Sequence, residues 1–215
     1  MISAAALASV LSGCSHSQKT DTTQQTAAAA DVAPGTLTID ILEGGRPEHY
    51  WQYEVQPGSG AVRIVKDATF SDPQHEDIPH TFQQPTGAIE AREKNPQSVS
   101  PDGVFTAFCA TTEADELSIA ETRTGGLLHQ WKAGRKIDGF AWAPNSRSVA
   151  ILNKSSEIGK NPADLPALAA GHPVPHDTVF LDVLDVRNGA TTEYRLRTDV
   201  IYSFTRILNW SSSAN

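Results

Sequence analysis

The sequence predicts an all-β protein built from repeated units of four short antiparallel strands. Short runs of β-branched and aromatic residues recur along the chain, turn-forming Gly, Pro and Asn residues separate them, and two long segments match each other at constant offsets. The chain has 215 residues, of which 39% are hydrophobic and 20% charged, a composition that is ordinary for one large globular domain or two small ones.

The repeat is clearest where SVSPDGVFTAF is compared with AWAPNSRSVAI. Pro101 aligns with Pro144 at an offset of 43 residues. Further on, LSIAETRTG matches LDVLDVRNG, and Gly125 aligns with Gly189 at an offset of 64 residues. The second copy therefore holds 21 additional residues, which fall within Lys154 to Asp177.

This insert contains four prolines and no alternating pattern, so we expect a surface loop. A short helix around Ala163 to Ala170 is the only helix that we expect after residue 35.

Each copy divides into four strands, with Pro-Asp-Gly and Asn-Gly sequences at the tight turns. The expected strands are 104–111, 117–121, 127–132 and 137–142 in the first copy, and 148–153, 179–186, 192–197 and 200–210 in the second. Upstream, TLTIDILEG, HYWQYEVQ and GAVRIVKD indicate three further strands, with Pro57-Gly58 at a hairpin. A period near 40 residues made of short strands is typical of a β-propeller blade.

Trp142-Ala143-Pro144-Asn145-Ser146 resembles the WSPDG turn of the WD40-like repeats in the TolB family. Val99-Ser100-Pro101-Asp102-Gly103 is a closer copy that lacks the Trp, and Trp210-Ser211-Ser212 resembles the start of a third. The resemblance covers Gln97 to the C-terminus. It implies four-stranded antiparallel propeller blades and carries no reaction.

Residues 36–215 would then form a partial β-propeller of about three blades, with Trp210 at the start of another. Either the chain is part of a longer product, or another chain closes the open blades. Strands 179–186 and 200–210 are apolar on both faces, so we expect an uncovered sheet face that promotes self-association or proteolysis near Tyr202.

The first residues resemble a bacterial secretion and lipidation signal. Residues 1–13 are apolar and small, as in a signal peptide, and Leu11-Ser12-Gly13-Cys14 resembles the bacterial lipobox. The resemblance implies lipidation of Cys14 and cleavage after Gly13. Residues 14–35 are polar and small, which predicts a flexible, disordered tether. Ser15 resembles the sorting signal for the outer membrane; the alternative is a plain signal peptide with a chance cysteine.

Several function classes receive no support from the sequence. The net charge of −8 argues against nucleic-acid binding. No G-x-S-x-G, P-loop, G-x-G-x-x-G or C-x-x-C motif is present, so we expect no catalytic residue and no cofactor.

The histidine pairs and the other notable side chains have structural interpretations. His75 and His80, and His172 and His176 beside Asp177, have proline-containing surroundings that favour polar loops over a metal site. Cys109 alternates with apolar neighbours and is expected to be a buried, unreactive thiol. Four tryptophans at strand positions are expected to pack between blades: Trp51, Trp131, Trp142 and Trp210.

The function that fits these patterns is a lipid-anchored, non-catalytic binding or scaffold module of the bacterial cell envelope. Its partners would be the membrane, through the anchor, and an envelope protein or further blades. The alternative is the N-terminal propeller of a longer envelope peptidase, similar to prolyl oligopeptidases, whose catalytic domain lies downstream.

Overall fold

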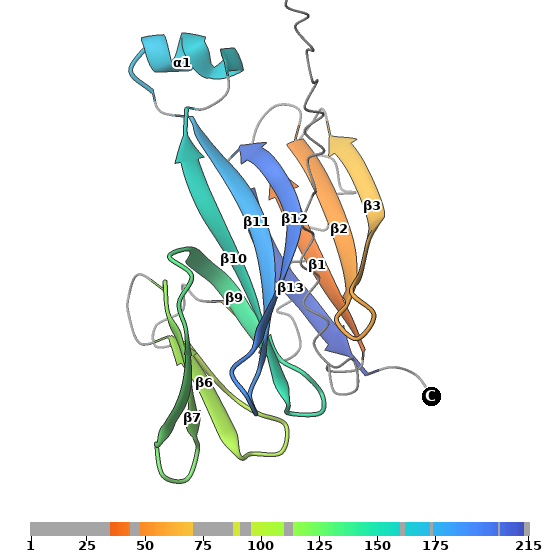
Figure 1. Ribbon diagram of the computed structural model, residues 1–215. Helices are drawn as coiled ribbons and strands as arrows, with labels where there is room; N and C mark the ends of the chain where they lie inside the picture. Colours follow the sequence, from red (N-terminus) through yellow and green to blue (C-terminus); the bar gives the residue numbers. More distant parts are fainter. Residues whose placement is uncertain are drawn as a thin grey trace, which may run out of the picture.

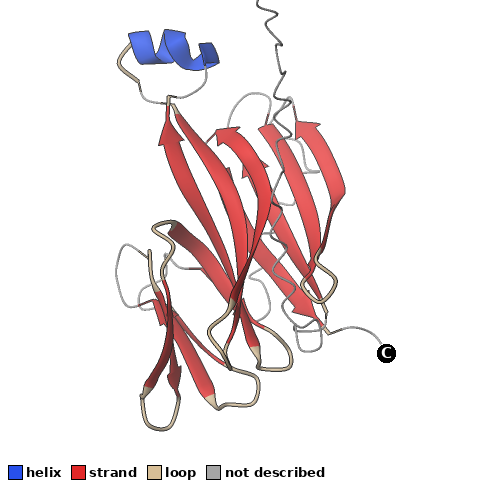
Figure 2. Cartoon of the chain, viewed as in Figure 1, coloured by secondary structure: helices blue, strands red, loops and turns tan. Residues whose placement is uncertain are grey.

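The computed structural model describes residues 35–43, 48–70, 88–90, 96–109, 114–159, 162–172, 174–201 and 203–212. These residues form thirteen strands in three antiparallel sheets, one 3₁₀ turn and one short helix (Figures 1 and 2). The predicted all-β class is therefore confirmed. Cys14, the expected leader and tether, His75, His80 and Tyr202 lie outside the described residues.

The first sheet, which we call the terminal sheet, combines strands from both ends of the described chain. Its order is β13 (Ser203–Ser211), β1 (Thr36–Glu43), β2 (Glu48–Gln56) and β3 (Ala61–Phe70). In β13, Trp210 pairs with Leu37 of β1. The prediction that Trp210 begins a further, unpaired blade is therefore wrong. The edge of β1 supplies the hydrogen-bond partners that β13 requires.

The other two sheets contain the repeated segments. The central sheet has the order β12 (Thr191–Ile201), β11 (Pro175–Asp185), β10 (Ser148–Ile158), β9 (Lys136–Trp142) and β4 (Ala88–Glu90). The small sheet has the order β5 (Gln97–Val99), β6 (Phe105–Cys109), β7 (Leu117–Glu121) and β8 (Leu127–Trp131).

Most strands overlap the predicted segments, but the sequence did not predict β4 and β5, and it assigned two segments to the wrong sheet. Segment 137–142 pairs with β10 and not with β8, and segment 200–210 is divided between β12 and β13. The proline turns explain why segment 137–142 pairs with β10. They are tight hairpins, in which the amide of Ser100 donates to the carbonyl of Phe105 at 2.8 Å and that of Ala143 to Ser148 at 2.8 Å. A hairpin turn makes its two flanking strands neighbours.

Both faces of the central sheet are covered. In β10, Ala150 and Leu152 belong to the apolar core shared with the terminal sheet, whereas Val149 and Ile151 belong to the core shared with the small sheet. This alternation places the central sheet between the other two. Strand 179–186 therefore lacks the uncovered face that the sequence suggested, whereas β13 of the terminal sheet still exposes Phe204, at 53%.

The four tryptophans occupy these two cores, as predicted. Trp51 and Trp210 lie between the terminal and central sheets, and Trp131 and Trp142 lie between the central and small sheets.

The insert forms the end of a long hairpin rather than a loop throughout. Strand β10 continues to Ile158 and β11 begins at Pro175, so the expected loop is shorter than predicted. The helix α1 (Leu165–Ala169), preceded by the 3₁₀ turn Pro162–Asp164, confirms the helix expected there. Figure 1 shows α1 beyond the end of the β10–β11 hairpin. Among the described residues, no helix has the length and apolar character needed to cross a membrane.

Candidate functional site

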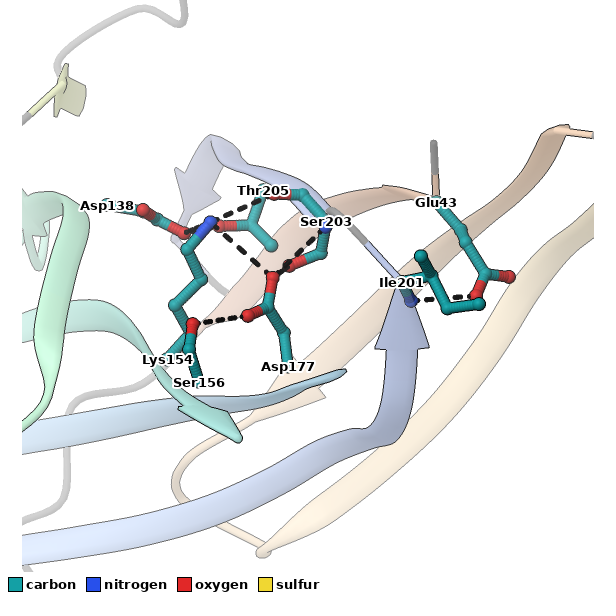
Figure 3. A network of polar contacts seen from close by, with 8 residues as sticks. All are labelled: Glu43, Asp138, Lys154, Ser156, Asp177, Ile201, Ser203 and Thr205. Atoms are coloured by element: carbon teal, nitrogen blue, oxygen red, sulfur yellow. Dashed lines mark hydrogen bonds and ion pairs between the residues drawn. The ribbon is translucent and has the colours of Figure 1, made fainter. Parts of the chain in front are cut away.

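Each of the two sheet interfaces contains one buried cluster of charged and polar side chains. The Lys154 cluster lies on the face of the central sheet that is turned towards β13 (Figure 3). Its members come from β9, β10, β11 and β13: Asp138, Lys154, Ser156, Asp177, Ser203 and Thr205.

Lys154 is the centre of this cluster. Its Nζ donates to the backbone carbonyl of Ser203 at 2.9 Å and lies 3.4 Å from Oδ2 of Asp138 and 3.8 Å from Oδ2 of Asp177. An ammonium has three N–H donors, and three acceptors surround this one. Lys154 therefore connects the two carboxylates to β13.

Asp177 accepts hydrogen bonds at both of its oxygens. The hydroxyl of Ser156 donates to Oδ1 at 2.5 Å, while the amide and the hydroxyl of Ser203 donate to Oδ2 at 3.1 and 2.5 Å. The residue is only 4% exposed. Three hydrogen-bond donors and a nearby ammonium therefore surround this carboxyl.

Asp138 has a different environment. Burial raises its pKa, and the nearby charge of Asp177 acts in the same direction. Lys154 and the hydroxyl of Thr205, which donates to Oδ2, lower the pKa by less than burial raises it. Burial thus disfavours the charged form of Asp138, which lies next to a second carboxyl that accepts three hydrogen bonds.

A serine, a lysine and two aspartates in one cluster resemble the parts of a hydrolase, but this geometry does not support attack on an external substrate. Ser203 is 4% exposed, and its hydroxyl already donates to Asp177. A nucleophile must reach its substrate, and a hydroxyl buried between two sheets does not. The cluster instead connects β13 to the central sheet. Nearby, the amide of Ile201 donates to Glu43 of β1 at 2.8 Å, which links the same two sheets (Figure 3).

The Asp182 cluster lies on the opposite face of the central sheet, against the small sheet. Asp182 is 1% exposed, and its Oδ2 accepts from the indole of Trp131 at 3.1 Å, from Arg135 at 2.8 Å and from Asn153 at 3.1 Å. Arg135 also donates to Glu193 at 2.7 Å. The cluster thus links β8 and the β8–β9 connection to β10, β11 and β12.

Electrostatics at this second cluster follow from burial and pairing. Burial raises the pKa of Asp182, the charge of Arg135 opposes this effect, and Glu193 adds to it. The guanidinium of Arg135 also lies 4.0 Å from the ring centre of Phe180, a distance that is favourable for a cation–π interaction. The arginine therefore stabilises this interface through charge, hydrogen bonds and packing.

The histidines of the insert have different environments from each other. His176 lies in β11, 4% exposed, and its Nε2 is hydrogen-bonded to Asp164, whereas His172 is exposed. The expectation that both lie in polar loops is therefore wrong for His176. Within the described ranges, no three His, Cys, Asp or Glu side chains converge in a way that could hold a metal ion.

Cys109 is a buried free thiol, as the sequence predicted, and burial raises its pKa to about 11. The sequence analysis did not identify either cluster. The available signal was a charged residue inside an otherwise apolar strand, such as Asp182 within FLDVLD or Lys154 directly after SVAILN. Such positions indicate buried ion pairs, but they do not say which partners meet.

In comparisons with known proteins, no protein-family model matches the chain, and neither does any curated protein.

Proposed function

We propose that this chain is a non-catalytic binding or scaffold module of the bacterial cell envelope, built from propeller-type blades and held at a membrane by lipid on Cys14. The observation that carries the proposal is the agreement between the two repeated turns. Gly103 and Ser146 occupy the same position, both have positive φ, at 75° and 60°, and each amide donates to the residue three positions earlier, at 2.8 and 2.9 Å.

A second pair of turns agrees equally well. Gly125 and Gly189 have φ values of 70° and 72°, and their amides donate to Glu121 and Asp185 at 2.8 and 2.9 Å. Repeated turns at matching positions are what a series of related blades requires. They support the resemblance to WD40-like repeats on which the propeller proposal depends.

The distribution of side chains favours a scaffold over an enzyme. The Lys154 and Asp182 clusters lie between sheets, where their hydrogen bonds join strands from different sheets. Exposed apolar side chains lie on the small sheet and on the terminal sheet. Val99 and Leu127 are 52% and 54% exposed, on the face turned away from the central sheet. Exposed apolar groups of this kind support a contact with a partner protein or with further blades.

The anchor is tested by expressing the full chain in a bacterial host fed with an alkyne-labelled fatty acid. We expect label on the wild-type protein and recovery with the outer membrane, and an unlabelled precursor from Cys14→Ser. A Cys109→Ser variant should keep the label. A mature N-terminus other than Cys14, or equal labelling of Cys14→Ser, would refute the anchor.

The non-catalytic assignment has its own test. Purified protein should not hydrolyse peptide or ester substrates above the rate of a Ser203→Ala variant. Hydrolysis by the wild type that disappears in that variant would show that the Lys154 cluster is an active site.

A further inference from the structure

We propose that the Lys154 cluster is a site of self-modification, at which Nζ of Lys154 and Cγ of Asp138 condense into an amide bond. The product would be a covalent cross-link between the neighbouring strands β9 and β10. This inference goes beyond the proposed function and does not depend on it.

The first argument is proximity. Strands β9 and β10 are paired neighbours, and the register shift between Leu152 and Asn153 brings Asp138 and Lys154 to the same face. Nζ lies 3.4 Å from Oδ2 of Asp138, with both side chains largely buried. Oδ2 is bonded to Cγ, the atom that Nζ would attack, so the fold holds the amine against the carboxyl group, and groups held together in this way have very high effective concentrations.

The second argument is the assignment of chemical roles. Condensation needs a neutral carboxyl group as electrophile, and burial raises the pKa of Asp138 towards that form. It also needs an acceptor for the ammonium proton, and Oδ2 of Asp177 lies 3.8 Å from Nζ. The hydroxyl of Thr205 donates to Oδ2 of Asp138, where negative charge develops when the amine adds to the carbonyl.

The step is balanced without any co-reactant. Asp177 takes one proton from the ammonium of Lys154, and the freed Nζ lone pair forms a bond to Cγ of Asp138. The Cγ–OH bond then breaks, and the hydroxyl leaves as water with a second proton from the nitrogen. One N–H remains on the new amide, and Asp177 returns its proton to solvent. The protein becomes lighter by one water molecule.

A competing reaction must be distinguished. Asp138 precedes Gly139, and an Asp-Gly backbone can also lose water when the glycine nitrogen attacks Cγ. That reaction leaves Lys154 free, so its products differ from those of the cross-link.

Tryptic mapping of the full-length folded protein provides the test. Trypsin cleaves after Lys136, Arg147, Lys154 and Lys160. We expect no cleavage after Lys154 and a branched peptide that joins residues 137–147 to residues 148–160, lighter than their sum by one water. Fragmentation should place the link on Asp138 and Lys154.

Three variants complete the experiment. Lys154→Arg should restore the linear peptide 137–147, while Lys136→Arg, an exposed lysine on the same strand β9, should retain the link between residues 138 and 154. Asp138→Asn should form a branched peptide of the same final mass, because the amide would lose ammonia where the acid loses water. This variant keeps the proposal testable if Lys154→Arg does not fold.

Three results would overturn the proposal: cleavage after Lys154 with peptide 137–147 at its full mass, a water loss confined to peptide 137–147, or a link from Lys154 to Asp177.

Discussion

Ser146 shows how a residue with a side chain fits a turn position that glycine occupies in the other copy of the repeat. It stands where the first copy has Gly103, and it adopts a φ of 60°, which is unfavourable for a side chain with a β-carbon. Its hydroxyl accepts a hydrogen bond from the amide of Asp102 at 3.0 Å, which joins the two repeated turns. The hydrogen bond offsets part of the backbone cost.

This balance leads to a stability prediction. Ser146→Gly should change the free energy of unfolding by less than about 1 kcal/mol, because the lost hydrogen bond is offset by relief of backbone strain. Ser146→Val should destabilise by more than about 2 kcal/mol, since a β-branched residue at positive φ also loses the hydrogen bond. Urea denaturation measures both variants, and equal effects would contradict the argument.

Asp182 should make stability depend on pH. Burial raises its pKa above the ordinary value of 3.8. The folded protein therefore binds this proton more tightly than the unfolded chain, so the contribution to stability is present below pH 3.8 and is lost as pH rises through the folded-state pKa.

Asp182→Asn should remove the loss of stability that ionisation of Asp182 causes as the pH rises. Urea denaturation at a series of pH values above 3.8 should give a shallower loss of stability for this variant than for the wild type. Asp199→Asn, which replaces an exposed carboxyl in the same sheet, is the matched control. Identical pH slopes for wild type and Asp182→Asn would contradict the prediction.

Cys109 should react slowly in the folded protein. Its thiol is buried and has a pKa of about 11, whereas the thiolate is the reactive form. In a Cys14→Ser background, a chromogenic disulfide reagent at pH 8 should label Cys109 at least tenfold more slowly in buffer than in denaturing urea. Equal rates would show that the strand is accessible.

At the scale of elements, the end of the β10–β11 hairpin depends on a buried contact. Asp164, directly before α1, is hydrogen-bonded to His176, and no residue of α1 itself is buried. The helix therefore has little apolar packing to hold it in place. The side-chain contact between Asp164 and His176 compensates for that lack.

Asp164→Ala should loosen this end without unfolding the sheets. We expect faster proteolysis within 159–174 and an unchanged midpoint of thermal unfolding, because the apolar cores lie elsewhere. His172→Ala, at an exposed neighbouring position, should have no effect on either measurement. A large drop in the midpoint for Asp164→Ala would mean that the insert supports the core.

At the scale of the whole molecule, β13 joins sequence ends that are far apart. Ile207 and Trp210 complete the core that contains Leu37, Ile39 and Ile41. Removal of residues 203–215 should expose this core, abolish the cooperative thermal transition and increase binding of an apolar dye. Removal of 213–215 alone is the control and should change neither measurement. A cooperative transition without β13 would contradict its structural role.

The sequence by itself determined most of the strands, the tight turns and the short helix of this protein, although it did not reveal β4 and β5. Alternating apolar residues and Pro-Asp-Gly or Asn-Gly turns are local signals, and they placed β7 at its observed bounds and the turns around Gly103 and Gly189 correctly. The burial of all four tryptophans followed from the same local pattern, since apolar strand positions face a core.

Only the tertiary structure decided which strands share a sheet and which charges meet. Segment 137–142 could pair with the strand before it or after it, and alternation is the same in both cases. The pairing of β13 with β1, and the meeting of Asp138, Lys154 and Asp177, join positions that no local pattern connects. These contacts depend on the stacking of three sheets, because only their combined packing brings distant side chains within hydrogen-bond distance.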